Sequence, residues 1–172
     1  MSTYTMTIYI FRGLYADEKQ ARRDIERKRW PTGPVCPYCG ATTRIGIQER
    51  VSRRTRAKVE GYYRCNSCQS TFTVRTGTQF QRSHVPLNTW LIAMFLIEHV
   101  YDYRKTTASI LSSELGIPQK TAWLLLKRYR TANSQGKSSS NQLVPKDLLK
   151  SIVDELCEML SHIRDSKPYA DW

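Results

Sequence analysis

Two pairs of cysteines, each pair separated by two residues, constrain the fold of this 172-residue chain more than any other feature. Cys36 and Cys39 form the first pair, and Cys65 and Cys68 form the second. Two intervening residues let a tight turn aim both sulfurs at one point, and two such turns supply the tetrahedral four-thiolate set that Zn²⁺ prefers. The spacing therefore predicts one zinc ion, held by all four cysteines.

The two pairs are also compatible with two disulfides, two unrelated redox motifs or an iron–sulfur cluster. Zinc is favoured because Gly40 and Gln69 follow the pairs together with β-type residues, whereas a redox pair normally opens a helix. Four protein ligands leave no coordination position for an activated water, so the metal is predicted to be structural and not catalytic. It would complete a β module of about 50 residues, whose apolar core is too small to stand alone.

Residues 31–82 are predicted to be a four-cysteine zinc ribbon with a basic hairpin loop. Three short runs rich in Thr, Ile, Tyr and Val are typical of strands: residues 42–48, 59–64 and 71–74. The interval between Cys39 and Cys65 holds 25 residues. Because the commonest ribbon spacing is about 15 to 20 residues, a long β-hairpin is expected to absorb the excess.

The expected tip of this hairpin, residues 50–58, carries five basic side chains and no acidic one. Arginines in such a tip can straddle phosphates or enter a narrow minor groove, where the potential of DNA is most negative. A solvated loop without a partner is the alternative. The candidate DNA contacts of this loop are Arg50, Arg53, Arg54, Arg56 and Lys58.

Residues 1–30 are predicted to hold a strand and a helix. The first ten residues alternate apolar side chains with threonines, which is typical of a strand. They contain neither a basic leader nor a small-residue cleavage site, so no secretory signal is expected. Residues 17–29 begin with acidic side chains and place Ala21 and Ile25 four positions apart, which indicates a short helix with one apolar stripe.

Residues 83–132 are predicted to be a three-helix unit that contains a helix-turn-helix. Apolar residues recur with a helical period in residues 87–101, in residues 108–115 and, after Gly116, from Pro118 onward. Helix, glycine-containing turn and helix is the arrangement that places a second helix in the major groove of DNA. A small helical bundle with no ligand is the alternative.

On that geometry, five side chains of the last of these helices are candidate DNA contacts. Gln119, Lys120 and Thr121 would form its exposed first turn, where base edges are read. Lys127 and Arg128 would lie on or near the outer face, within reach of phosphates. Because Gln and Lys suit both base and backbone contacts, the DNA sequence that is read does not follow from these residues.

The carboxyl-terminal part is predicted to be a linker followed by a helix. Residues 133–144 begin with NSQGKSSSN, which has no apolar side chain and indicates a flexible linker. Residues 145–172 are predicted to form an amphipathic helix, because five apolar residues repeat with heptad spacing: Leu149, Ile152, Leu156, Met159 and Ile163. This seam, within residues 146–163, could dock on the same chain, join a second copy or bind a partner protein.

The charge of the chain points to a polyanionic partner. The formal net charge is +12, of which residues 1–82 contribute +10. No apolar run approaches the roughly 18 residues that a membrane-spanning helix needs. We therefore expect duplex DNA as the partner, no membrane association, and a cytoplasmic location, on the nucleoid if the source is bacterial.

Four motifs follow one another between Phe11 and Ala132: RWPTGPVCPYCG, YYRCNSCQSTFTVRTGTQF, VPLNTWLIAMFLI and LSSELGIPQKTAWLLLKRYR. Their order resembles the amino-terminal part of zinc-ribbon transposases of bacterial insertion sequences, the group numbered fifteen ninety-five. The resemblance implies an α+β chain in which a small zinc-ribbon β module precedes a three-helix DNA-binding unit. It also implies that the four cysteines are the zinc ligands. In that family a ribonuclease-H-like nuclease domain follows.

The sequence predicts a non-catalytic, zinc-dependent protein that binds duplex DNA of the transposon-end or operator type. Only 40 residues follow Ala132, whereas a two-metal strand-transfer site needs three separated carboxylates projected from a sheet. One alternative is an adaptor that binds another protein. The other is an RNA-binding ribbon in which Tyr62, Tyr63 and Phe72 stack on bases, although their simpler role is the ribbon core.

Overall fold

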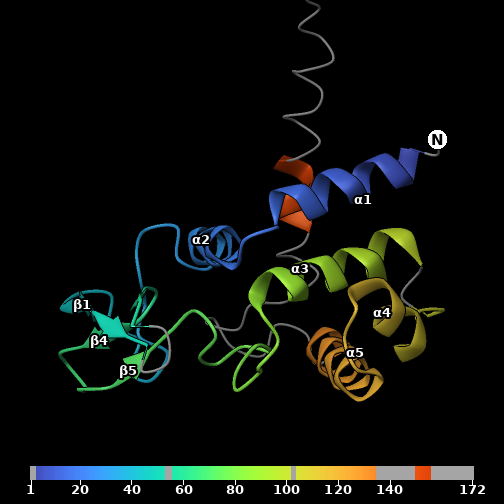
Figure 1. Ribbon diagram of the computed structural model, residues 1–172. Coiled ribbons are helices and arrows are strands. Elements are labelled where there is room, and N and C mark those ends of the chain that lie inside the picture. The colour runs from blue at the N-terminus through green and yellow to red at the C-terminus, as the bar shows by residue number, and fades with distance from the viewer. Residues whose placement is uncertain (1–2, 53–55, 102–103, 135–149, 156–172) are drawn as a thin grey trace, which may run out of the picture.

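The computed structural model describes residues 3–52, 56–101, 104–134 and 150–155 (Figure 1). The helices are α1 (Thr3–Leu14), α2 (Glu18–Arg29), α3 (Leu87–Phe95), its π-helical continuation η1 (Leu96–Val100), α4 (Ala108–Leu115) and α5 (Gln119–Ser134). The strands are β1 (Ile45–Ile47), β2 (Arg50–Val51), β3 (Lys58–Val59), β4 (Tyr63–Cys65) and β5 (Thr71–Phe72). The molecule thus combines helices with small antiparallel sheets, as the sequence predicts.

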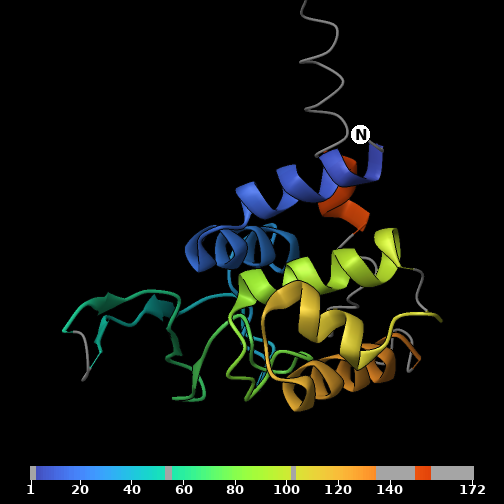
Figure 2. The same cartoon turned by 45° about the vertical axis from the view of Figure 1, so that its right-hand side comes forward.

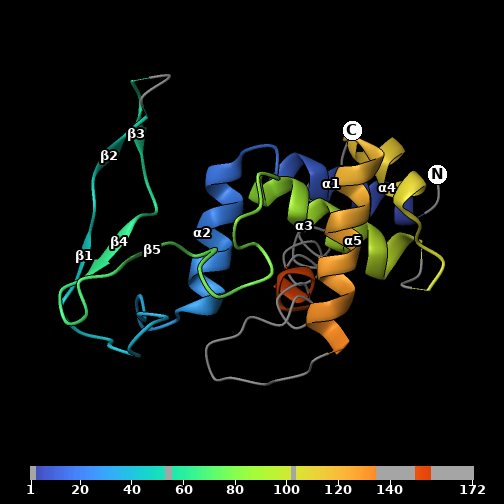
Figure 3. The ribbon, with the colours of Figure 1, turned by 90° about the horizontal axis from the view of Figure 1, so that it is seen from below.

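The strands gather at one end of the molecule and the helices at the other, with α2 beside the strands (Figures 1 and 2). The larger sheet has the order β1-β4-β5 and is antiparallel, with Ile45 opposite Cys65 and Tyr63 opposite Phe72. The second sheet, β2-β3, projects away from it as a separate two-stranded ladder (Figure 3). The long interval between the cysteine pairs is therefore a hairpin, as predicted.

The amino-terminal segment is a helix, and the predicted strand is wrong. Residues 3–14 form α1, because Phe11 and the following Tyr15 pack on the helical core with their side chains buried. The Phe11 ring stacks on Phe95 of α3, with 4.4 Å between ring centroids. The alternation of apolar residues and threonines suits a strand, but contacts with α3 select the helical period instead.

Helix α2 matches its prediction and begins with a side-chain cap. The carboxylate of Asp17 accepts a hydrogen bond from the backbone N–H of Lys19 at 3.2 Å, which satisfies one free amide of the first turn. Ala21 and Ile25 are fully buried on the face that meets α3. The opposite face carries basic side chains, among them Lys19 and Arg23.

The helical core forms around α3, which is apolar on nearly every side. Its buried side chains include Trp90, Leu91, Met94 and Phe95. Helices α4 and α5 pack against each other and α4 also meets α3. The four residues of α5 that the sequence places inward are all buried: Ala122, Leu125, Leu126 and Tyr129.

The turn between α4 and α5 has a defined local cause. Thr107 caps the start of α4, its hydroxyl accepting a hydrogen bond from the N–H of Ile110 at 3.3 Å. Gly116 ends the helix in the left-handed region at φ 62°, a conformation that glycine adopts without steric cost. Helix α5 then starts directly after Pro118, and its continuation to Ser134 extends into the predicted linker.

One turn of the predicted carboxyl-terminal helix, residues 150–155, lies within the described part and is helical. Ile152 is 2% exposed and belongs to the common core. The carboxylate of Glu155 pairs with Lys28 and, at 3.1 Å, with Arg27 of α2. This turn therefore docks on its own chain; residues 135–149 and 156–172, including most of the predicted linker and seam, lie outside the described residues. No helix within the described ranges has the length and hydropathy to span a bilayer.

Candidate zinc site and nucleic-acid interface

The two cysteine pairs lie on two turns with the same backbone pattern. The N–H of Cys36 donates to the carbonyl of Ala41, and the N–H of Cys65 donates to the carbonyl of Ser70, each at 2.9 Å. After each pair the chain enters the left-handed region, at Gly40 with φ 72° and at Gln69 with φ 62°. These matched turns face each other because strand β4 carries Cys65 alongside β1.

The four sulfurs form one cluster with the dimensions of a zinc site. Cys36 Sγ lies 3.6 Å from Cys68 Sγ, and Cys39 Sγ lies 3.7 Å from Cys65 Sγ. All four sulfurs lie within 4.8 Å of one another, and none is in a disulfide. Zn–S bonds of about 2.3 Å in a tetrahedron place sulfurs about 3.8 Å apart, so the cluster fits one ion. The four cysteines are positioned to bind one zinc.

Hydrogen bonds around the second cysteine pair favour the thiolate form that zinc requires. Hydrogen bonds from Ser70 lower the pKa of Cys68 to about 6. The backbone N–H of Cys68 is the largest cause of the lowered pKa of Cys65. Because a metal-bound sulfur must be deprotonated, these donors favour the state of Cys65 and Cys68 that binds the ion. At Cys39 a backbone hydrogen bond at Ala41 lowers the pKa, but burial and hydrogen bonds with the other thiols outweigh it and raise the pKa to about 12.

The ribbon is attached to α2 by an aromatic cluster. Trp30 directly follows the helix and packs edge-on against Tyr63 and Phe72, with ring centroids 5.5 Å and 5.8 Å away. The rings of Tyr63 and Phe72 stack at 5.6 Å, and Phe72 is 1% exposed. The ribbon-core role predicted for Tyr63 and Phe72 is therefore confirmed.

Arginine side chains reinforce this junction in a way that sequence patterns do not reveal. Arg29 Nη1 donates to the carbonyl of Val74 at 2.6 Å, and burial lowers the pKa of Arg29 to about 10. Arg22 Nη2 pairs with Glu60 at 2.7 Å across the gap between α2 and the ribbon. Nonlocal contacts of this kind leave no periodic signal in the sequence.

The basic hairpin holds three of its five predicted contact residues within the described part. Strands β2 and β3 pair Arg50 with Val59 and Val51 with Lys58. The guanidinium of Arg50 lies 4.4 Å from the centroid of the Tyr62 ring. Arg56 lies at the tip with φ 56°. Arg53 and Arg54 lie outside the described residues.

The outward face of α5 carries most of its predicted contact residues. Gln119 and Lys120 are exposed at its first turn, whereas Thr121 is half-buried. The ammonium of Lys127 lies 5.1 Å from the centroid of the Trp123 ring, which is 51% exposed. Seen from below, α5 lies in front of α3, and the ribbon strands lie at the left of the view, beyond α2 (Figure 3).

Arg128 has a role inside the chain that the sequence does not indicate. Its Nη1 donates to the backbone carbonyl of Gln81 at 2.8 Å and to that of Gln79 at 3.4 Å. Both acceptors lie on the segment that leads from the ribbon to α3. Arg128 thus joins α5 to this segment, in addition to the phosphate contact predicted for it.

Comparison with known proteins agrees with the cluster. Residues 16–71 match the model of the transposase zinc-ribbon domain family. The chain is 32% identical over 120 residues to a protein of Halobacterium salinarum described as an uncharacterized protein in transposable element ISH50. The match covers 69% of this chain and 36% of that relative, so the chain spans about a third of its length. No solved structure matches. Residues 16–71 therefore form a transposase zinc-ribbon domain, in a chain related to a protein of an insertion-sequence element.

Proposed function

We propose that this chain binds duplex DNA as the recognition part of a transposase-like protein. The observation that carries the proposal is the composition of α5. Its 16 residues include four basic side chains and no acidic one. Among the exposed side chains are Gln119, Lys120, Trp123 and Lys127. A cationic helix with exposed amide and ammonium groups is suited to a polyanion with readable base edges.

In this proposal α4, the Gly116 turn and α5 act as a helix-turn-helix. A 16-residue helix is about 24 Å long, and its width of about 10–12 Å fits the major groove. Gln119 and Lys120, exposed at the first turn of α5, would reach base edges, with Thr121 beside them. The sequence-selective part of binding would come from this turn.

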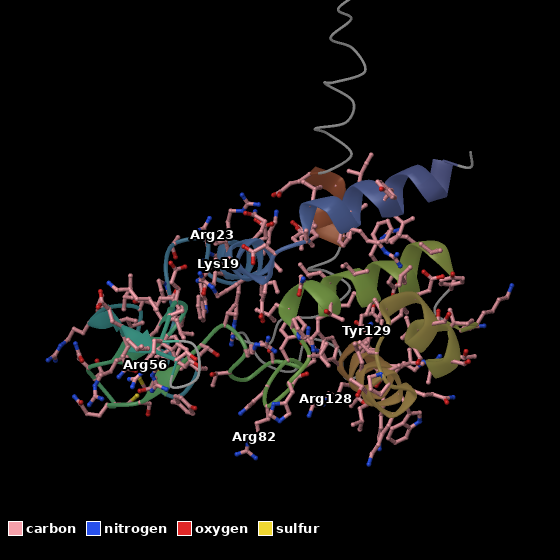
Figure 4. The ribbon with its side chains drawn as sticks, viewed as in Figure 1. Lys19, Arg23, Arg56, Arg82, Arg128 and Tyr129 are labelled. Atoms are coloured by element: carbon pink, nitrogen blue, oxygen red, sulfur yellow. The ribbon has the colours of Figure 1, made fainter. Side chains whose placement is uncertain are left out.

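The β2-β3 hairpin would supply a second, less selective contact. It projects from the larger sheet (Figure 3) and carries the exposed Arg56, which belongs to the ribbon end of the molecule in Figure 4. Its basic residues would contact phosphates or the minor groove, which is the route by which arginine-rich arms gain affinity without base contacts. Zinc would hold this hairpin in place, because it joins the two cysteine turns that flank the paired strands β1 and β4 at the base of the hairpin.

The role proposed for this part of the protein is recognition and not chemistry. Four sulfurs fill a tetrahedral coordination sphere, which leaves no position for a metal-bound water. The DNA target would be a transposon end or an operator-like site, bound inside the cell. Protein partners have one observation in their favour, since Trp123 and Leu124 are 51% and 44% exposed on α5. An adaptor that uses this face is the second candidate.

Selection from a random pool of duplexes, with zinc-loaded protein, tests the proposal. We expect an enriched sequence, and loss of binding after zinc is chelated. Gln119→Ala and Lys120→Ala should weaken the preference for that sequence. Arg53→Ala together with Arg54→Ala should weaken binding to all duplexes alike and lower the salt slope of that binding by about one unit per lost phosphate contact.

Competitors then separate DNA recognition from its alternatives. Single-stranded DNA and structured RNA of equal length should compete less well than the selected duplex. Equal competition by RNA would favour the RNA-binding ribbon. A salt-resistant protein complex that depends on Trp123, with no duplex enriched at any salt concentration, would favour the adaptor and contradict the proposal.

A further inference from the structure

Two surface grooves of similar size differ in whether acidic side chains line them. One, of about 470 Å³, lies between α2 and the ribbon and is lined by both basic and acidic side chains. Its arginines are engaged inside the chain: Arg22 pairs with Glu26 and Glu60, and Arg75 pairs with Glu18 at 2.6 Å. The other, of about 490 Å³, has no acidic residue among the residues that line it. An anion bound in the second groove would therefore meet no lining carboxylate, whereas the first groove would present Glu18 and Glu60 to it.

This second groove, here the α5 groove, lies between residues 77–81 and the outer face of α5. Gly77, Thr78 and Gln79 form one wall, and Lys127 and Thr131 belong to the other. The two hydrogen bonds from Arg128 to the carbonyls of residues 79 and 81 hold the walls together. The groove is thus a built feature of the chain and sits directly beside the helix proposed to enter DNA.

Within this groove, the side-chain amide of Gln79 lacks a hydrogen-bond partner among the described residues. Its Nε2 and Oε1 are both buried, and neither has a hydrogen-bond partner among the described residues. A buried amide without a partner is costly, and most such groups in proteins are satisfied by water, an ion or a ligand. The donor Nε2 can form a hydrogen bond to a phosphate oxygen. No acidic residue lines the groove to repel that phosphate.

Besides Arg128, two basic side chains belong to this groove or to its rim, namely Lys127 and Arg82. Lys127 lines the groove, and neither Lys127 nor Arg82 forms an ion pair with any residue in the described ranges. Arg82 is exposed and directly follows the wall, in a left-handed backbone conformation with φ 53°. In Figure 4 Arg82 and Arg128 lie on the lower side of the molecule, whereas Lys19 and Arg23 lie on α2 above.

We propose that the α5 groove seats one phosphodiester backbone of bound DNA, with Lys127 as a direct contact, Arg82 at its rim, and the Gln79 amide, buried in the free chain, turning outward to donate to a phosphate oxygen. Arg128 is a positioning residue, because its hydrogen bonds to the carbonyls of residues 79 and 81 hold the groove wall that contains Gln79. The site deepens the proposed function and rests on it. With α5 in the major groove, the flanking backbone strand would run along the loop between the ribbon and α3, so both parts of the chain would grip one duplex.

The test compares two groove variants with a matched control in zinc-loaded, full-length protein. Affinity for the selected duplex is measured over a series of salt concentrations. Lys127→Gln with Arg82→Gln should lower the salt slope by about two units. Lys19→Gln with Arg23→Gln removes the same charge from exposed positions of α2 and should leave the slope nearly unchanged. A slope that falls equally in both double variants would overturn the groove site, while DNA binding itself would stand.

Gln79→Leu tests the buried amide with no change of charge. It removes a donor that has no partner among the described residues, so the free energy of unfolding should stay the same or rise. The affinity for the duplex should fall by about tenfold, as expected for a lost hydrogen bond to a charged group. Unchanged affinity with raised stability would show that Gln79 is a packing residue and would overturn its part. Failure of the unaltered protein to bind any duplex would instead contradict the proposed function.

Discussion

The Nη1 of Arg128 lies 2.8 Å from the backbone carbonyl oxygen of Gln81, 47 residues earlier in the chain. Through this hydrogen bond, helix α5 holds the segment that leaves the zinc ribbon. The ribbon is held from the other side by Trp30, which follows α2. The orientation of the ribbon relative to α5 is therefore set by side chains as well as by the backbone.

Arg128→Lys should destabilise the protein although it keeps the charge. The ammonium of lysine ends one bond short of the Nη1 that makes both hydrogen bonds, so at least one of the two carbonyl bonds is lost. We expect the free energy of unfolding to fall by about 1–2 kcal/mol in urea titrations of the zinc-loaded protein. Lys127→Gln, one position away and exposed, should change it by less than about 0.5 kcal/mol. Equal stability of the lysine variant, together with a lower salt slope for DNA in the charge-removing variant Arg128→Gln, would favour the phosphate contact predicted from sequence.

Removal of zinc should unfold the ribbon. Cys39→Ser and Cys65→Ser each remove one ligand from the cluster, and structural zinc supplies roughly 10–16 kcal/mol in small finger peptides. We expect one zinc per chain in the unaltered protein and a large loss of bound metal in both variants, measured by elemental analysis. Cys157→Ser changes the remaining cysteine, outside the cluster, and should keep one zinc. Full folding without metal, or disulfides within the two pairs, would contradict the site.

Signals that are local in sequence predict their parts of the structure well. The cysteine spacing fixes the metal cluster, Asp17 and the apolar stripe fix α2, and Gly116 fixes the turn before α5. The cap of α2 and the Gly116 turn depend on interactions within a few residues. The cluster joins cysteines that are 26 and 32 positions apart, but each pair sits on a local turn with a recognisable spacing, so the pattern still contains the information. The heptad spacing around Ile152 is compatible with docking on the same chain and with dimerisation. In the structure, residues 150–155 dock on the same chain.

Features that depend on distant contacts could not be predicted in this way. The first ten residues have a strand-like alternation in the sequence, whereas residues 3–14 form a helix that packs against α3 and η1. Arg75 donates to the carbonyl of Val85 and pairs with Glu18, 57 residues away. The unpartnered amide of Gln79 likewise becomes visible only when residues 77–81 are placed beside α5. No spacing rule connects the members of such sites, because the fold and not the local sequence brings them together.

Truncation of two tryptophans should affect different properties, the stability of the protein at Trp30 and duplex binding at Trp123. Trp30→Ala removes the 5% exposed ring that joins α2 to the ribbon and should cost about 3–5 kcal/mol of stability. Trp123→Ala removes a 51% exposed ring and should change stability by less than about 0.5 kcal/mol while it weakens duplex binding. Thermal unfolding and binding titrations of both variants check this. A large loss of stability in the Trp123 variant would show that this ring serves packing and not recognition.

Two glycines provide a matched pair in which the same substitution has opposite signs. Gly116 lies at φ 62°, and a Cβ there would meet no atom within 4 Å, so the cost of Gly116→Ala arises from the backbone alone. A left-handed L-residue costs about 1–2 kcal/mol, and we expect that loss in the free energy of unfolding. Gly13 lies within α1, has no positive φ and is equally open to a Cβ. Gly13→Ala should therefore stabilise the protein by about 0.5–1 kcal/mol, because alanine is the better helix former.

Urea titrations of both variants at equal zinc saturation measure these changes. Because α4 and α5 meet at this turn, Gly116→Ala should also weaken duplex binding if the pair acts as a helix-turn-helix, whereas Gly13→Ala should leave binding unchanged. A destabilised Gly13 variant would argue against a helical conformation at this position. A Gly116 variant with unaltered stability would show that the turn does not require the left-handed conformation, and the angle between α4 and α5 would then have another cause.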